Sequence, residues 1–503
     1  MITIGEQLVH VLRQAGVTRV YGVVGDSLNP FVDAIRRTEG IEWVHVRNEE
    51  AGAFAAAAEA HLTGRLAVCA GSCGPGNTHL IQGLYNAHRD GVPVLAIASH
   101  IPTEQIGTSF FQETHPERLF VECSHYCELV SQVSQMPRLA RIAIQHAIGR
   151  GGVSVLVMPG DVLYRSAEHP TGESAPVTVK GTVVPAHEQV RELAERLNRA
   201  RTVPQRHTVQ VDHDQSRLGR RTPLDLAVHG DVAATLRAVL PLVKQKPDRS
   251  FLHDMLREHA RALEHVVDAY TRDIANRTPI HPEYAASILD ELAADDAVFT
   301  VDTGMCNVWA ARYITPNGRR RVIGSFLDGT MANALPHAIG AQFAYPGRQV
   351  ISMSGDGGLG MLLGELLTVA LHRLPVKIVT FNNSSLGMVK LEMLVSGLPD
   401  FETDHASVNY SAIAQAAGIH AIRIEQPKDI RAGLEDALNY PGPALVDLVT
   451  DSNALSIPPH ITGTQMAGFA LAATKIVLDG GVGQMLEMAR ANLRNIPGAE
   501  LLR

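Results

Sequence analysis

The first 160 residues alternate two patterns of apolar positions. In one, apolar residues recur every three or four positions, which predicts helices with one buried face. In the other, several apolar residues follow one another, as in VPVLAIAS at 92–99, which is typical of strands covered on both faces. Helices of about 10–15 residues between such strands indicate βαβ units and a parallel sheet. The predicted elements are helices over 6–15, 31–37 and 50–61, a helix ending at Asp90, and strands over 19–23, 41–45, 66–69 and 92–99.

A second region, about 285–455, repeats this order. Gly64 and Gly347 each end an Ala-rich helix, and Pro93 and Pro375 each open an apolar strand. The members of these two pairs are 283 and 282 residues apart. Between them, each region carries a strand, a Gly-rich loop (GSCGPG or GDGGLG) and a helix. The agreement in order, element type and spacing predicts two related α/β domains.

Composition narrows the class of protein. With 503 residues, 45% of them hydrophobic and 19% charged, the chain is expected to form about three globular domains of ~150 residues each. A net charge of −8 offers no basic field for nucleic acid. No apolar run approaches the ~18–20 residues that cross a bilayer, and the amphipathic N-terminus is unlike a signal peptide. Five cysteines in so long a chain predict reduced thiols and a cytoplasmic location.

The loop GDGG at 355–358 carries the first candidate chemistry. Glycines after a strand of an open α/β sheet let a ligand approach the backbone, and phosphate is the usual ligand there. Asp356 is unsuited to touch phosphate directly, but it suits a Mg²⁺ that bridges to one. FNNSS at 381–385 ends the next strand, which would bring Asn383 beside Asp356. Alternatively, Asp356 caps a helix and Asn382-Asn383 form a turn.

From Gly355 to Asn383, the segment GDGGLGMLLGELLTVALHRLPVKIVTFNN resembles the cofactor signature of the thiamine-diphosphate-dependent enzymes. The resemblance implies that Mg²⁺ is bound by Asp356, the Asn383 side chain and the Ser385 carbonyl. It places the diphosphate at Gly357 and Gly358, and Met331 under the thiazolium ring. The further positions expected to line the cofactor are Gly355, Asn382, Ser384, Leu386 and Gly387.

The N-terminal region carries a matching part of this family's site. VRNEEAGAFAAAAEA at 46–60 resembles the segment with the catalytic glutamate, and the alignment gives that role to Glu49, with Glu50 beginning the helix. The family usually has His before this residue, where this chain has Asn48. A carboxylate is needed there to hydrogen-bond the pyrimidine and favour its imino form. The loops expected to close over the pyrimidine contribute Gly25, Asp26, Ser72, Gly74 and Gly76.

Within this family, the chain resembles the flavin-containing pyruvate oxidases, also called pyruvate:quinone oxidoreductases. Segments such as GVVGDSLNP, GTSFFQETHPERLF and FNNSSLGMVKLEM carry the likeness over most of 1–180 and 250–497. Phe111 and Gln112 fall where that branch contacts substrate. The resemblance implies oxidation of pyruvate to acetate and CO₂, with electrons passing to FAD and then to a membrane quinone. In the family, the two halves of the site come from different subunits, which implies a homodimer or homotetramer.

The middle of the chain departs from this pattern. HEQVRELAERLNRARTV at 187–203 resembles the start of the branch's flavin domain, and residues 208–243 resemble its end. The intervening βα units are missing, and only the strand end at Asp212 matches a flavin contact. FAD is therefore in doubt. Two alternatives follow: a flavin-independent 2-keto acid decarboxylase or carboligase, and a non-catalytic remnant that binds thiamine diphosphate.

The predicted architecture is two related open parallel-sheet domains around a shortened α/β middle domain. Residues 465–503 resemble the branch's membrane-contacting C-terminal segment, with apolar Met485, Leu486, Met488, Leu493 and Ile496 beside Arg490 and Arg494. That stripe fits either a helix at a lipid surface or one docked on its own subunit. The run 319–321, three arginines, is expected to be a solvated loop. The predicted segments are 1–180, 181–250, a helical linker 251–280, 281–464 and the tail 465–503.

Overall fold

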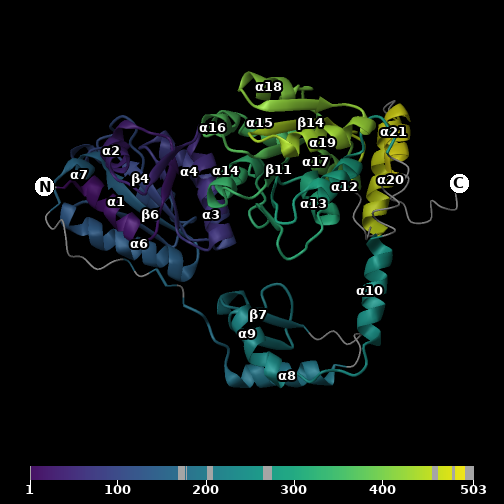
Figure 1. The fold of residues 1–503 in the computed structure, drawn as a ribbon, viewed down its shortest axis with the longest axis horizontal. Helices are drawn as coiled ribbons and strands as arrows, with labels where there is room; N and C mark the ends of the chain where they lie inside the picture. Colours follow the sequence, from purple (N-terminus) through teal and green to yellow (C-terminus); the bar gives the residue numbers. More distant parts are fainter. Residues whose placement is uncertain are drawn as a thin grey trace. The chain divides into compact units, whose positions relative to one another are not determined.

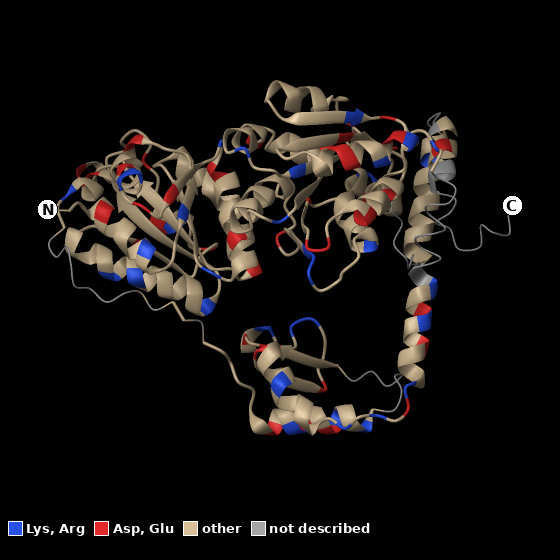
Figure 2. Ribbon diagram, viewed as in Figure 1, with Lys and Arg blue, Asp and Glu red and all other residues tan. Residues whose placement is uncertain are grey.

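The computed structural model describes residues 2–167, 176, 178–179, 181–200, 208–263, 275–455, 463–478 and 482–492 (Figure 1). The chain divides into two compact units. One combines Met1–Thr178 with Val267–Arg503, and the other is Val179–Val266. Acidic and basic residues are interspersed along the described ribbon of both units (Figure 2).

The N-terminal half of the large unit is built on a six-stranded parallel sheet in the order β2-β1-β3-β4-β6-β5. Its central strands β3, β4 and β6 are buried along their whole length, as expected for strands covered by helices on both faces. The strands are β1 Arg19–Gly22, β2 Glu42–His45, β3 Ala67–Gly71, β4 Val94–His100, β5 Tyr126–Leu129 and β6 Val153–Pro159. The helices are α1 Ile4–Gln14, α2 Asn29–Arg37, α3 Glu49–Thr63, α4 Pro75–Asp90, α5 Pro116–Leu119, α6 Met136–Arg150 and α7 Gly160–Tyr164.

The C-terminal half has a second six-stranded parallel sheet, in the order β10-β9-β11-β12-β14-β13. Its strands are β9 Val298–Val301, β10 Arg321–Gly324, β11 Val350–Gly355, β12 Lys377–Asn382, β13 His420–Ile424 and β14 Ala444–Val449. Its helices are α12 Pro282–Leu292, α13 Met305–Tyr313, α14 Ala334–Ala344, α15 Asp356–Met361, α16 Glu365–Leu371, α17 Gly387–Val395, α18 Tyr410–Ala416 and α19 Ile430–Asn439.

The strand order of the second sheet reproduces that of the first, strand for strand. In both sheets the order reverses beside the first strand, between β1 and β3 and between β9 and β11. Such a reversal leaves a crevice at the carboxyl ends of the strands, where ligands of open α/β sheets bind. The prediction of two related parallel-sheet domains is confirmed.

The two halves meet through the Ala-rich helices α3 and α14 (Figure 1). Small side chains let the helices approach closely: a Cβ built on Gly340 would overlap the carbonyl of Ala55. Gly340 is therefore required by the close contact of the two backbones. The Tyr345 hydroxyl donates to the Leu62 carbonyl at 2.7 Å near the other end of α3. One buried apolar cluster extends across both halves.

The small unit contains a two-stranded parallel sheet, β7 Val209–Asp212 beside β8 Leu226–His229. Helices α8 His187–Arg199, α9 Val232–Val239 and α10 Ser250–Leu263 accompany it. Its buried apolar residues are Val190, Leu193, Ala194, Leu226, Val228 and Val239. So small a core agrees with the shortened middle segment inferred from the sequence. Residues 204–207, through which that shortening was inferred, lie outside the described residues.

The C-terminal segment forms α20 Gly463–Leu478 and α21 Val482–Asn492. Ala472, Ile476 and Met488 are buried in a cluster with Leu394 and Leu455 of the C-terminal half. A Cβ on Gly468 would overlap the Val395 carbonyl, so α20 packs closely on α17. Leu493, Arg494 and Ile496 are outside the described residues, as is the side chain of Arg490. Among the described helices, none has the length and apolar character needed to cross a membrane.

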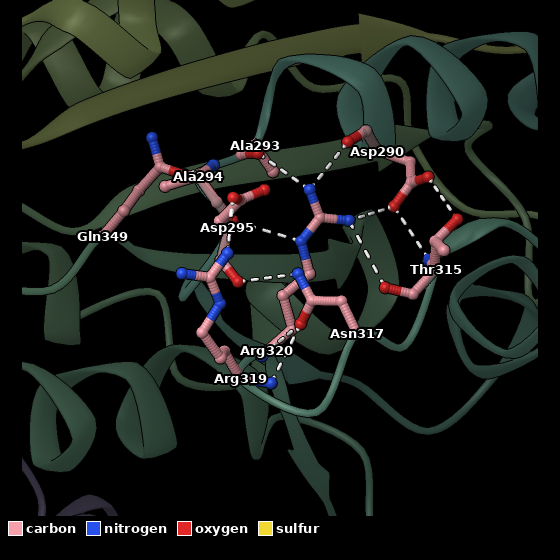
Figure 3. A network of polar contacts seen from close by, with 9 residues as sticks. All are labelled: Asp290, Ala293, Ala294, Asp295, Thr315, Asn317, Arg319, Arg320 and Gln349. Atoms are coloured by element: carbon pink, nitrogen blue, oxygen red, sulfur yellow. Dashed lines mark hydrogen bonds and ion pairs between the residues drawn. The ribbon is translucent and has the colours of Figure 1, made fainter.

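Two local expectations were wrong. The single helix expected after GDGG is two short helices, α15 and α16, separated at 362–364, where glycines at 360 and 364 weaken a continuous helix. The run 319–321 is only partly solvated, because the Arg320 side chain is 8% exposed. Its guanidinium donates to Asp290 and to the carbonyls of Ala293 and Ala294, closing the end of α12 (Figure 3). Arg319, 64% exposed, pairs with Asp295.

Candidate active site

In the N-terminal half, the predicted residues gather at the carboxyl end of the sheet. Gly25 follows β1, Glu49 follows β2, and Ser72, Gly74 and Gly76 follow β3. A Cβ on Gly25 would overlap the Ser72 hydroxyl, and one on Gly76 would lie 2.9 Å from Oε1 of Glu49. The glycines therefore allow the β1 loop to approach the β3 loop, and the β3 loop to approach the Glu49 carboxylate. Asp26 is also in this loop cluster, but its side chain is exposed.

Glu49 is the first residue of α3, one position earlier than the sequence predicted for the helix start. Asn48 is the N-cap, and its side-chain oxygen accepts from the backbone N–H of Glu50 at 2.9 Å. The Glu49 side chain is buried, and its Oε2 lies 2.9 Å from Nδ1 of His79 on α4. His79 was not predicted as a site residue, although it lies only three residues beyond the Gly-rich loop that ends at Gly76.

Gln112 lies against the same loop. Its Oε1 accepts from the Cys73 thiol at 3.4 Å, and a Cβ on Gly74 would lie 2.8 Å from its Cβ. Gln112 has a left-handed backbone, with φ of 63°, which is costly for a residue with a side chain. Phe111 differs, because 77% of it is exposed. The structure thus places Gln112 beside Glu49's loop and directs Phe111 away from the fold.

In the C-terminal half, one cavity collects most of the predicted cofactor and metal residues. It lies at the carboxyl ends of β9, β11 and β12. The predicted residues that line it are Met331, Gly355, Asp356, Gly357, Gly358, Asn383, Ser385, Leu386 and Gly387. Asn382 does not line it: this buried side chain donates to the Val408 carbonyl and to Asp447. Ser384 does not line it either, but its backbone N–H donates to Asp356.

Asp356 begins α15 and is 2% exposed. Its Oδ1 accepts from the N–H of Gly357 at 3.0 Å, and its Oδ2 accepts from the N–H of Ser384 at 2.6 Å. Burial raises the pKa of this carboxyl, although the nearby His405, at 3.7 Å, lowers it. A buried carboxylate with only backbone donors is well placed to gain from a cation. The bond to Ser384 joins the β11 loop to the β12 loop.

The β12 loop supplies further oxygen donors. Oδ1 of Asn383 accepts from the Ser385 N–H at 3.0 Å, and Ser385 is buried. Ser384 between them has a left-handed φ of 54°, a strained backbone of the kind that collects at ligand sites. A carboxylate, an amide oxygen and a backbone carbonyl are the hard donors that Mg²⁺ prefers. Within the described residues there is no cluster of three or more His, Cys, Asp or Glu side chains for a metal, so an oxygen set with one carboxylate is the candidate.

The glycines of the β11 loop line the cavity and let neighbouring side chains approach the backbone closely. A Cβ on Gly357 would lie 2.9 Å from Leu386 and 3.3 Å from Met331, and one on Gly358 would overlap the carboxylate of Asp302. Met331 lines the same cavity beneath this loop, followed by Ala332 with a φ of 68°. These residues fit a diphosphate and its divalent cation.

Asp302, at the end of β9, was not predicted as a site residue. It is 1% exposed, and its Oδ1 accepts from the Ala334 N–H at 3.1 Å and the Asn333 side chain at 3.3 Å. Its Oδ2 has no hydrogen-bond partner within the described residues. Burial raises the pKa of Asp302 to about 7. The signal in the sequence was an acid followed by Thr-Gly directly after an apolar strand, as in GDGG.

All residues that line this cavity belong to the C-terminal half. Glu49, Phe111 and Gln112 are in the N-terminal half and do not line it. Asp212, the predicted flavin contact, ends β7 of the small unit, where its Oδ1 accepts from the Asp214 N–H at 2.9 Å. The structure therefore assembles the predicted residues into two clusters, one in each half of the large unit.

Comparison with known proteins agrees with this division. Residues 2–119 match the family described as thiamine pyrophosphate enzyme, N-terminal TPP binding domain, and residues 302–448 match its C-terminal TPP binding domain. A Bacillus subtilis (strain 168) protein named as thiamine pyrophosphate-containing, YdaP, is 30% identical over 93% of this chain and 95% of its own length. This chain belongs to the thiamine pyrophosphate enzyme family. Its two described site clusters lie within the two matched domains.

Two further relatives bear on the reaction. The pyruvate oxidase of Lactiplantibacillus plantarum is 27% identical over 89% of this chain and 88% of its own length. The large subunit of acetolactate synthase isozyme 1 from Escherichia coli (strain K12) is 27% identical over 92% of this chain and 97% of its own length. The YdaP alignment runs over 549 positions, more than the 503 residues of this chain, so the relative has residues that this chain lacks.

Proposed function

We propose that this chain is a thiamine-diphosphate- and Mg²⁺-dependent enzyme that decarboxylates pyruvate. The observation that carries the proposal is the oxygen set of Asp356, Asn383 and Ser385, which lines one cavity together with Met331. Asp356 and Asn383 would hold Mg²⁺ through their side chains, and Ser385 through its carbonyl. When bound, the cofactor would supply a carbon nucleophile for the keto carbon and a sink for the electron pair released with CO₂.

In this proposal, the Glu49 carboxylate would hydrogen-bond the cofactor's pyrimidine ring and favour its imino form. Its burial and its converging glycine loops exclude water from the carboxylate, which strengthens a hydrogen bond made there. His79, 2.9 Å away, fixes the orientation of Oε2 and leaves Oε1 facing Gly76. Gln112 is placed to contact substrate beside this carboxylate, whereas Phe111 would do so only where a second surface covers it.

We propose a homodimer as the smallest active assembly, with a tetramer as its doubled form. The cavity around Asp356 has no lining residue from the N-terminal half, so a copy of that half is needed to bring Glu49 to it. Exposed Phe110 and Phe111 in the N-terminal half, and Met361 and Leu367 near the cavity, are apolar surface that an interface would bury. Sedimentation with and without cofactor tests this assembly.

The proposed reaction has an oxidative and a non-oxidative form. In the oxidative form, electrons pass to FAD and then to a membrane quinone, with the C-terminal helices contacting lipid; similarity to pyruvate oxidase supports this form. The small unit does not fit this route well, since its described residues form two strands and bury six apolar side chains. That observation favours a flavin-independent decarboxylase or carboligase. Similarity to acetolactate synthase supports the same alternative.

Product analysis of purified protein tests the proposal. Incubation with pyruvate, thiamine diphosphate and Mg²⁺ is expected to release CO₂ and yield acetaldehyde or acetolactate without an electron acceptor. Acetate formed only with an acceptor, together with bound yellow flavin, would instead support the oxidative route. Cofactor binding without any CO₂ release would identify a non-catalytic remnant.

A further inference from the structure

Several polar contacts cross the interface between the halves of the large unit, and two of them are made by residues at corresponding positions of the two halves. Glu365 of α16 binds the backbone just ahead of α3, and Gln82 of α4 binds Asp328, a few residues ahead of α14. Glu365 and Gln82 are 283 residues apart, the same offset that separates Gly64 from Gly347. The contacts are therefore equivalent by the internal duplication: each half reaches from corresponding helices toward the segment preceding the other half's Ala-rich helix.

The equivalent contacts differ in chemistry. Gln82 is a neutral amide that donates to the Asp328 side chain at 2.7 Å. Glu365 is a carboxylate, 1% exposed, whose Oε1 accepts from the N–H groups of Arg47 at 3.1 Å and Asn48 at 3.0 Å. Its Oε2 accepts from the buried Thr368 hydroxyl at 2.7 Å. Burial raises the pKa of Glu365 to about 7.

The Glu365 carboxylate holds the backbone immediately ahead of Glu49. Asn48 is the N-cap of α3, and Glu49 is the first residue of that helix. An acceptor that binds two successive backbone N–H groups restricts both the position and the orientation of the backbone at residues 47 and 48. The backbone just before Glu49 is therefore held by Glu365, a residue of the C-terminal half. The Thr368 hydroxyl orients the Glu365 carboxylate.

We infer that Glu365 is a positioning residue for Glu49: by accepting from the backbone N–H groups of Arg47 and Asn48, it fixes the start of α3 and so the placement of the Glu49 carboxylate. The inference rests on the proposed function in one respect, namely that Glu49 takes part in the reaction. The backbone clamp itself is a structural statement that can be tested without turnover.

Hydrogen exchange of the backbone amides tests the clamp directly. In E365Q the side chain keeps its shape but loses its charge, and we expect the amides of Arg47 and Asn48 to exchange about tenfold faster than in the wild type. The kcat for CO₂ release should fall about tenfold, with the KM for pyruvate changed less than about twofold. T368V, which removes only the orienting hydroxyl, should shift exchange and kcat in the same direction by a smaller factor.

Q82A is the matched control, because it breaks the equivalent contact on the other side of the interface. It should leave the exchange of residues 47 and 48 and the kcat unchanged. Unchanged exchange in both E365Q and T368V would overturn the inference, and so would equal effects of Q82A and E365Q on kcat. If the wild type releases no CO₂, the proposed function fails, while faster exchange in E365Q would still establish the clamp.

Discussion

The two halves of the large unit share a strand order and differ in the chemistry at equivalent strand ends. After the second strand, the N-terminal half has Glu49, whereas the C-terminal half has the loop with Met331. After the third strand, the N-terminal half has a neutral loop with Ser72, whereas the C-terminal half has Asp356. One half thus carries the carboxylate predicted to bind the pyrimidine, and the other the carboxylate predicted to bind Mg²⁺. The comparison indicates that a repeated scaffold was specialised by exchanging a few loop residues.

The sharpest way to test this division is E49Q. Removing the charge should lower kcat for CO₂ release by about 100-fold or more, because the hydrogen bond to the pyrimidine loses its ionic acceptor. Binding of thiamine diphosphate should change less than kcat does, since the residues proposed to hold Mg²⁺ and the diphosphate are in the other half. Steady-state kinetics and titration calorimetry measure the two effects. E50Q, the adjacent glutamate, is the control and should retain most of the activity.

D356A should give the opposite result. Losing this carboxylate, or removing Mg²⁺ with EDTA, should weaken thiamine diphosphate binding on the order of 10–100-fold. Trp309 lines the cavity, so quenching of its fluorescence is a suitable measure of binding. D404A replaces a neighbouring exposed acid that does not line the cavity and should bind normally. Normal cofactor retention by D356A in chelator would contradict the metal assignment.

The contact between the halves can be disturbed without touching either cluster. In G340A the added methyl group would overlap the Ala55 carbonyl, so α3 and α14 must move apart. We expect a loss of about 1–3 kcal/mol in the free energy of unfolding. Chemical denaturation of G340A and G347A makes the comparison, because Gly347 has open space around its Cβ position. Equal free energies of unfolding for the two variants would contradict the close contact between α3 and α14.

The last expected effect concerns the pH dependence that Asp302 gives to the stability of the chain. Its pKa of about 7 exceeds the ordinary 3.8, so the folded chain holds this proton more tightly than the unfolded chain does. Its contribution to stability is therefore most favourable below about pH 4 and is lost as pH rises to about 7. D302N removes this dependence, which is on the order of 3 kcal/mol between pH 5 and pH 8. Urea denaturation of cofactor-free protein at pH 5 and pH 8 measures it.

Much of this arrangement could be predicted from the sequence. Strands buried on both faces leave continuous apolar runs, and glycine loops mark the strand ends, so both sheets and both clusters were found. Partners distant in sequence were not: nothing near Glu365 indicates that it reaches residues 47 and 48. The burial of Arg320 was missed for the same reason, since its acceptors, the Asp290 carboxylate and two backbone carbonyls, are 26 to 30 residues away. The break at 362–364 lies in a run that remains apolar throughout.

The small unit, Val179–Val266, has a consequence for how the chain is connected. The entropic cost of closing a flexible connection grows slowly with length, by about 0.6 kcal/mol for each doubling. The seam between α3 and α14 is held by its own close packing rather than by the connecting segment. A chain of this kind can therefore lose much of its connecting domain at little thermodynamic cost to the thiamine domains. Such a connection keeps the two thiamine domains in one chain, and its length can change with little effect on their stability.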